Sequence, residues 1–159
     1  MDEPMLILGA IPEDVYSTNT NVYFLDKRVS SSNDRFFEKD ITNKDDMESL
    51  LKDNAGKFAT IIFDVGVWHH LFENGGSPQI NIIAMLLRDG GKLYLPQTKI
   101  YTYIKWELKL NEPAIKRRDD SASKLLVDAG LDVEQDIDYT IDIFSNRKHT
   151  FIVGVKTQH

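Results

Sequence analysis

Short apolar runs recur along the chain and are separated by polar segments. Residues 5–8 read Met-Leu-Ile-Leu and end at Gly9, which is typical of a strand buried on both faces. Two later runs rich in β-branched and aromatic residues predict a closing hairpin. The strands that the pattern predicts are 5–8, 21–26, 39–41, 60–64, 92–95, 138–144 and 150–155, the last two joined by residues 145–148.

Amphipathic segments between these runs predict helices. A short helix begins at Pro12, since proline suits the first helical position, and Glu13 and Asp14 suit the positive end of its dipole. Ser121 as N-cap and Gly130 as the terminating residue bound another helix. The predicted helices run from residue 12 to about residues 19–21, and over 45–52, 80–87 and 121–129.

Strands that alternate with helices predict an α/β domain with a parallel sheet and right-handed crossovers. In such sheets ligands bind outside the carboxyl ends of the strands. The predicted strands end near Gly9, Asp26, Asp40 and Asp64. Aspartate is also a common turn residue, so each carboxylate is either a turn former or a ligand contact. Three of them at successive strand exits favour a ligand site.

Length and composition limit the class of protein. The 159 residues, 42% of them hydrophobic, predict a single domain over residues 1–159. The absence of cysteine excludes disulfides, thiolate zinc sites and a cysteine nucleophile. No apolar run approaches the roughly 20 residues of a membrane span, and the first twenty residues lack a signal pattern. We therefore expect no membrane association and a cytoplasmic location.

The charge balance bears on the choice of partner. The formal net charge of −6 argues against a nucleic-acid partner, which would need clustered lysines and arginines. One basic cluster, residues 116–118, is followed at once by Asp119 and Asp120. We interpret it as a solvated face or a helix start rather than a phosphate-binding patch.

Two stretches carry a resemblance to a known family. Residues 58–71 read FATIIFDVGVWHHL, and residues 81–95 read NIIAMLLRDGGKLYL. The succession of a strand, a histidine-aromatic turn, an apolar helix, a Gly-Gly turn and a second strand resembles the class I S-adenosylmethionine (SAM)-dependent methyltransferases. The resemblance covers almost the whole chain. It implies a Rossmann-like three-layer sandwich, with a mostly parallel seven-stranded sheet that closes in a C-terminal antiparallel hairpin.

The resemblance also implies SAM as cofactor and assigns residues to it. Gly9 matches the first glycine of the cofactor loop, although a tight strand-to-helix turn explains this glycine equally well. Asp26 resembles the acid that binds the ribose hydroxyls, a task that suits a carboxylate because it can accept two hydroxyl donors. Asp40 resembles the acid that contacts the adenine amino group, and Ile41 resembles the neighbour that packs on the adenine ring.

The exit of the fourth strand faces the methyl group and the substrate in that family. Asp64 and His69 are therefore candidate catalytic residues, because histidine titrates near neutrality and a strand-end carboxylate can orient a nucleophile. Methyl transfer to nitrogen often needs only positioning. We expect no metal site, since His69 and His70 would point apart on a helix and no third ligand is evident.

The cofactor loop departs from the family pattern of an acid two residues before G-x-G-x-G. Ile7 stands at the acid position, and Ile11 and Glu13 replace the later glycines. Two functions therefore remain open. One is a SAM-dependent methyltransferase acting on a small molecule or a protein side chain, and the other is a catalytically inactive methyltransferase-like binding or scaffold subunit, a pseudoenzyme. A nicotinamide-dependent enzyme is a third, weaker alternative.

Residues 97–112 form a long connection in which Tyr101, Tyr103 and Trp106 alternate with lysines. Long connections in small domains are often functional. The resemblance implies a substrate lid here, and the composition also fits single-stranded nucleic acid or an oligomer interface. We favour contact with a second copy of the chain or with a partner protein.

NAD and other phosphate-bearing nucleotides are expected not to bind at the first crossover. A pyrophosphate needs backbone N–H groups at a helix start, where Pro12 offers none and Glu13 and Asp14 repel it. A thermal-shift assay with NAD checks this. A clear stabilisation that disappears when Gly9 is replaced would contradict the electrostatic argument.

Overall fold

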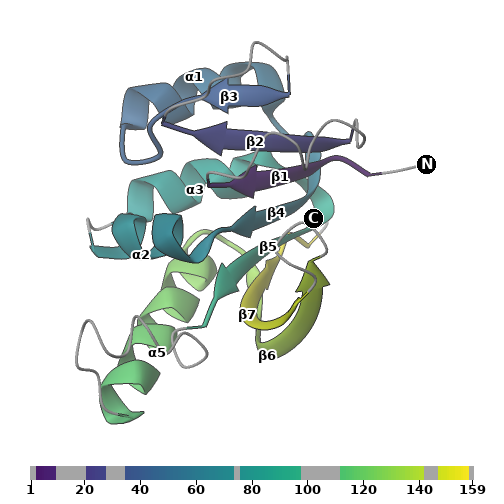
Figure 1. Cartoon of the computed structure of the whole chain (residues 1–159). Coiled ribbons are helices and arrows are strands. Elements are labelled where there is room, and N and C mark those ends of the chain that lie inside the picture. Colours follow the sequence, from purple (N-terminus) through teal and green to yellow (C-terminus); the bar gives the residue numbers. More distant parts are fainter. Residues whose placement is uncertain are drawn as a thin grey trace.

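The computed structural model describes residues 3–9, 21–27, 35–73, 76–97, 112–141 and 147–157. Its centre is a seven-stranded sheet in the order β3-β2-β1-β4-β5-β7-β6 (Figure 1). The first five strands are parallel, and β7 pairs antiparallel with both β5 and β6. This confirms the predicted mostly parallel sheet with a C-terminal antiparallel hairpin. The strands are β1 Met5–Leu8, β2 Val22–Asp26, β3 Phe36–Glu38, β4 Phe58–Phe63, β5 Leu87–Pro96, β6 Asp132–Ile141 and β7 Arg147–Val155.

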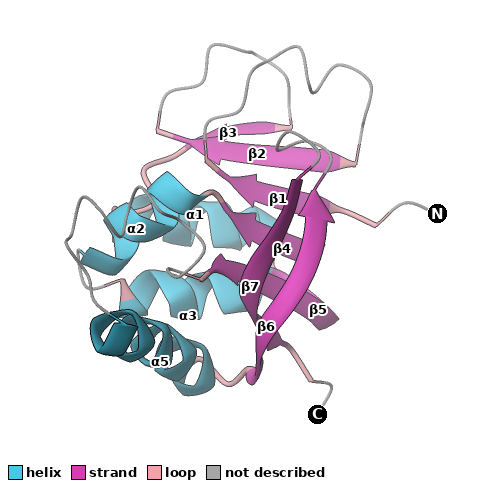
Figure 2. Ribbon diagram, turned by 60° about the horizontal axis from the view of Figure 1, so that its bottom comes forward, coloured by secondary structure: helices cyan, strands magenta, loops and turns pink. Residues whose placement is uncertain are grey.

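The described helices lie on one face of the sheet (Figure 2). They are α1 Lys44–Asn54, α2 Val65–Glu73, α3 Ser77–Leu86 and α5 Glu112–Asp128. Among the residues that the structure describes, no helix is long and apolar enough to cross a membrane. The helix predicted from residue 12 lies outside the described residues, so the third layer of the expected sandwich stays a prediction.

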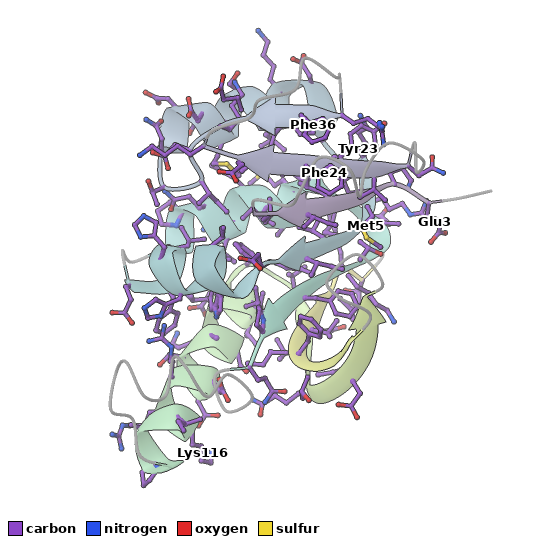
Figure 3. All side chains as sticks on the ribbon, viewed as in Figure 1. Glu3, Met5, Tyr23, Phe24, Phe36 and Lys116 are labelled. Carbon is purple, nitrogen blue, oxygen red and sulfur yellow. The ribbon has the colours of Figure 1, made fainter. Side chains whose placement is uncertain are left out.

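Both faces of the sheet are buried, which explains why its strands read as continuous apolar runs. Leu6 and Leu8 belong to the large cluster that packs against the helices, while Ile7 between them belongs to a cluster on the opposite face. Figure 3 shows Phe24 and Phe36 of that second cluster on neighbouring strands, and their rings stack with centroids 5.2 Å apart. Alternate residues of one strand therefore stabilise different layers.

The turn after α5 fixes how this helix meets the hairpin. The N–H of Gly130 donates to the carbonyl of Val127, and the N–H of Leu131 donates to that of Leu126, which is the Schellman pattern. Gly130 has φ +85°, in the left-handed region where glycine is favoured. Leu126 and Leu131 are both buried in the large cluster. The prediction that Gly130 ends this helix is confirmed.

The predicted third strand, residues 39–41, was placed too late. The N–H of Lys39 still donates to the carbonyl of Asp26, but the N–H of Asp40 donates to the carboxylate of Asp46 on α1. The ladder therefore ends there, and the strand is β3, Phe36–Glu38. Asn43 then caps α1 by accepting a hydrogen bond from the N–H of Asp46, so this helix begins one residue earlier than predicted.

Several other predicted boundaries were wrong, among them the start of β7, which is Arg147 rather than residue 150. The histidine-aromatic segment is the helix α2 and not a turn, and the Gly-Gly pair lies inside β5. Strand β6 begins at Asp132 rather than at residue 138. Helix α5 begins at Glu112, so Ser121 lies in its interior and is not an N-cap.

The early start of α5 has a physical reason. Its buried residues Ile115, Asp119, Ala122 and Leu126 recur at helical spacing, so they form one stripe. Asp119 interrupts the apolar pattern although it is only 7% exposed. The buried stripe is therefore continuous in the structure, whereas the pattern of hydrophobic residues in the sequence has a gap at position 119.

Truncating the buried stripe of α5 is expected to destabilise the fold. Leu126 is fully buried, so Leu126→Ala should cost about 2–5 kcal/mol of unfolding free energy through lost contacts and a cavity. Its neighbour Val127 is 57% exposed, and Val127→Ala should change stability by no more than about 0.5 kcal/mol. Urea unfolding of both variants measures the difference. Equal losses would contradict the packing described for α5.

Candidate functional site

The carboxyl ends of β1, β2 and β4 meet at one edge of the sheet. The N–H of Gly9, directly after β1, donates to the carbonyl of Leu25 at 2.9 Å. On the other side, the N–H of Asp64 donates to the carbonyl of Leu8 at 2.9 Å. The exits marked by Gly9, Asp26 and Asp64 are thus held side by side, as a parallel sheet requires.

Gly9 is needed for close packing at this edge. Its φ is +150°, and a Cβ there would lie 2.5 Å from the Cβ of Asp64 and 3.4 Å from Cγ2 of Val67. A side chain at this position would displace Asp64, whose carbonyl accepts the N–H of Trp68 in the first turn of α2. Gly9 therefore has a structural role, and its contact with a cofactor remains a prediction.

A cavity of about 180 Å³ opens between the exits of β2 and β3. It brings together Asp26, Asp40 and Ile41, the three residues predicted to hold an adenosine group. Gly9, Asp64 and His69 do not line it. The residues around the cavity are Leu25, Asp26, Lys27, Lys39, Asp40, Ile41, Val67 and His70.

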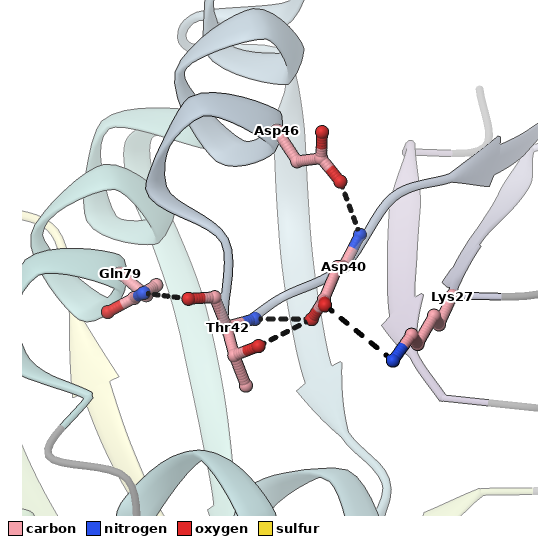
Figure 4. A network of polar contacts seen from close by, with 5 residues as sticks. All are labelled: Lys27, Asp40, Thr42, Asp46 and Gln79. Carbon is pink, nitrogen blue, oxygen red and sulfur yellow. Dashed lines mark hydrogen bonds and ion pairs between the residues drawn. The ribbon is translucent and has the colours of Figure 1, made fainter.

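Asp40 holds the turn between β3 and α1 (Figure 4). Its Oδ1 accepts hydrogen bonds from the Thr42 hydroxyl at 2.6 Å and from the Thr42 N–H at 2.9 Å. Its Oδ2 lies 3.9 Å from Nζ of Lys27. The hydroxyl bond, the N–H bond and, to a smaller extent, the charge of Lys27 lower the pKa of the Asp40 carboxyl, so it is ionised at neutral pH.

The same turn is tied to a second helix. Nε2 of Gln79, in the first turn of α3, donates to the carbonyl of Thr42 at 2.9 Å. Gln79 is buried, so this bond satisfies a polar group that has left water. The cavity wall at Asp40 and Ile41 is consequently fixed by side chains from α1 and α3 (Figure 4).

His69 lies away from the cavity, against α5. Its Nδ1 is 2.8 Å from Nη2 of Arg118, and a guanidinium can only donate, so Nδ1 is the acceptor. Neutral His69 therefore carries its proton on Nε2, and in this arrangement Nε2 can donate but cannot accept a proton. The predicted role of His69 as a general base would require Arg118 to move.

Arg118 joins α5 to α2 through several contacts. It donates to Oε1 of Glu73, and its guanidinium lies 4.4 Å from the centroid of the Phe72 ring. The Arg118 side chain is only 11% exposed, so the interpretation of residues 116–118 as a solvated face is wrong for this member. The hydrogen bond and then the charge of Arg118 lower the pKa of Glu73.

Sequence reasoning did not include His70 or Val67 in the site. They are three residues apart on α2 and share one face of it, while His69 and Glu73 share another. This spacing was the available signal, because adjacent histidines on a helix cannot both face one cavity. Among the residues that the structure describes, no group of three or more His, Asp or Glu could hold a metal ion.

Comparison with known proteins identifies the fold. No family model matches the sequence, and no curated protein matches it. Among solved structures, a SAM-dependent methyltransferase from Methanosarcina mazei aligns with a TM-score of 0.59 and 11% identity, over 99% of this chain and 94% of that one. The 16S rRNA (adenine(1408)-N(1))-methyltransferase from Catenulisporales acidiphilia aligns with a TM-score of 0.61 and 9% identity, over 99% and 89%.

A third similar structure includes a partner protein. It is a Haloferax volcanii complex containing the Trm112 methyltransferase activator, with a TM-score of 0.58, 12% identity and coverage of 99% and 83%. At these identities the likeness concerns the fold. The chain therefore has the class I methyltransferase fold, as the sequence resemblance implied.

Acid is expected to remove the contribution of the Glu73–Arg118 pair to stability. Because the folded pKa of Glu73 lies below the usual 4.5, ionised Glu73 stabilises the fold at pH above 4.5. That contribution is lost as the pH falls through the folded value. Glu73→Gln should therefore be less stable than the parent at pH 7, and the difference should shrink at acid pH.

Chemical unfolding of both proteins between pH 7 and pH 3 measures this convergence. Glu48→Gln is a suitable control, since Glu48 makes an exposed pair with Lys44 on α1 and such pairs contribute little. A stability difference for Glu73→Gln that stays constant over this range would contradict the ionic role of Glu73.

Proposed function

We propose that this chain, which has the class I methyltransferase fold, binds SAM at the exits of β2 and β3 and transfers its methyl group to a small molecule or a protein side chain. The observation that carries the proposal is the cavity that gathers Asp26, Asp40 and Ile41. These residues come from two separate segments, and each was assigned to the cofactor from the sequence.

The chemistry of the cavity suits an adenosine group. Leu25 and Ile41 offer apolar contact for a base, and both are buried. Asp26 is half-buried at the strand end, where its carboxylate can accept hydrogen bonds from two ribose hydroxyls. When bound, SAM supplies an electrophilic methyl group on a sulfonium, and the protein's task is to bind and orient it.

Among the described residues, Asp64 is our candidate to act on the methyl acceptor. It follows β4 at the same edge of the sheet, next to Gly9, and its side chain is half-buried. Its carboxylate can orient an acceptor amine or hydroxyl and take the proton that the acceptor releases. His69, bonded through Nδ1 to Arg118, positions α2 in this proposal rather than exchanging a proton.

A catalytically inactive binding subunit is the second candidate. It is favoured by the engagement of His69 with Arg118, which occupies the Nδ1 acceptor of one of the two predicted catalytic residues. The altered loop after Gly9 points the same way. Binding of SAM without methyl transfer to any amine, hydroxyl or protein acceptor would support this function.

The acceptor and the location are expectations from charge and composition. The net charge of −6 favours a small molecule or a protein over a nucleic acid, and a cytoplasmic location remains the expectation. Residues 98–111, which include the aromatic side chains expected to contact a second copy or a partner protein, lie outside the described residues.

SAM and its demethylated product are expected to bind weakly, and Asp26→Ala should weaken that binding by about 1.5–3 kcal/mol, as for hydrogen bonds to a charged group. Isothermal titration calorimetry with both compounds at millimolar concentration measures it. Asp53→Ala, which changes an exposed carboxylate of α1, is the control and should leave the affinity unchanged. No heat beyond dilution would refute the proposed function.

A further inference from the structure

A groove lies at the edge of the sheet opposite the strand exits, and we call it the amino-edge groove. Leu87, the first residue of β5, pairs with Phe58, the first residue of β4, so the end of α3 and the start of β5 lie at the amino ends of these parallel strands. The walls of the groove are the last turns of α3 and α5, which lie side by side on the sheet (Figure 2), the turn after α5, Asp89 and residues 156–157. Its volume of about 510 Å³ is within the roughly 300–1,000 Å³ that is usual for small-molecule sites.

The wall of the amino-edge groove is apolar. Ala84, Met85 and Leu131 line it, and Met85 is 52% exposed while the other two are buried. In the described part of the chain, Met85 and Val127 are the large hydrophobic residues that remain exposed. A methionine side chain is unbranched and polarizable, so it adapts to groups of different shape. Met85 therefore offers a contact surface to an apolar group in the groove.

The rim of the groove is polar and negatively charged. Asn81 and Asp89 are exposed, and within the described ranges neither side chain makes a hydrogen bond or an ion pair. Asp128 pairs with Lys124 at 2.9 Å, but both side chains are exposed and such pairs contribute little to stability. The carboxyl ends of α3 and α5 add the negative ends of their dipoles. The rim thus presents acceptors to a cation.

Lys156 also lines the groove, but its ammonium is already used. Nζ donates to the carbonyl of Leu87 at 2.8 Å and to that of Ala84 at 3.2 Å, at the end of α3. A cation at the carboxyl end of a helix satisfies its last carbonyls. Lys156 makes no ion pair with Asp89 or Asp128 in the described structure, so both carboxylates stay available to a ligand.

We propose that the amino-edge groove binds a small organic cation, that is, an ammonium group joined to an apolar or aromatic body. The ammonium donates to the carboxylates of Asp89 and Asp128, and the body contacts Met85. An anion of the same shape is repelled by these carboxylates. The inference is independent of the proposed function, since the groove lies at the edge of the sheet away from the strand exits and needs neither SAM nor methyl transfer.

The test is an amide-resolved NMR titration of the whole protein with phenethylamine as the probe. This compound carries an ammonium group on a short chain that ends in a phenyl ring. The amides of Asp89, Gly130 and Lys156 should shift and saturate at millimolar concentration, and binding should weaken as NaCl is added because salt screens exposed charges. Hydrocinnamate, which has the same ring and chain with a carboxylate in place of the ammonium, should not bind.

Variants separate the charge from the apolar contact. Replacing both carboxylates, Asp89→Asn with Asp128→Asn, should weaken phenethylamine binding at least about tenfold, as for hydrogen bonds to a charged group. Met85→Ala should weaken it about fourfold for each methylene group that loses its contact. Asp120→Asn is the matched control, because Asp120 forms the same kind of exposed lysine pair on α5 as Asp128 does but does not line the groove. It should leave the affinity unchanged.

The outcomes of this titration are distinct from those of the SAM titration. Saturable shifts at the groove that are lost in the double aspartate variant and kept in Asp120→Asn support the site whether or not SAM binds. Equal binding of hydrocinnamate would show apolar contact without recognition of charge and overturns the inference. Equal weakening by the control and the double variant, shifts centred on the exits of β2 and β3, or no shifts at all also overturn it and leave the proposed function standing.

Discussion

The strand β1 is hydrogen-bonded along both edges and buried on both faces, and the geometry of the site depends on it. It pairs with β2 through Leu8 and Leu25, and with β4 through Leu8 and Phe63. Because the three strands are parallel and in close register, their carboxyl ends reach the same level. The residues at their exits, Gly9, Asp26 and Asp64, therefore lie along one edge of the sheet.

A second set of contacts that shapes the site is polar and involves the helices. Arg118 connects α5 to the last turn of α2, and the bonds around Asp40 and Thr42 connect the β3–α1 turn to α3. Each connection uses a partly buried group whose partners replace water. One of them directs His69 away from the cavity, and the other shapes the cavity wall. The two sets of contacts thus determine which predicted residues meet.

The sequence predicted most of the sheet because its strands are short, apolar and buried on both faces, so the signal does not depend on tertiary context. The errors occur where a polar side chain determines where a strand or helix begins or ends. Strand β3 ends early because the N–H of Asp40 bonds to Asp46, and α5 begins early because Asp119 lies in its buried stripe. Neither contact has a local hydrophobic signature.

The site was predictable where strand order alone brings residues together, as it does for Asp26, Asp40 and Ile41. The choice between His69 and His70 depends on the rotation of α2, and that rotation is set by its contacts with α5. The sequence alone does not indicate this rotation, because the contacts of Arg118 with α2 join residues far apart in the chain. The catalytic role of His69 therefore stays a prediction.

The contact between Gly9 and Asp64 links the variation of two positions that are far apart in the chain. With only 2.5 Å between the Asp64 Cβ and the place of a Cβ on Gly9, any larger residue at position 9 requires the backbone after β4 to shift. In related chains we therefore expect the two positions to change together or not at all. Evolution of new chemistry at the exit of β4 is then restricted by a glycine fifty-five residues earlier, at the end of β1.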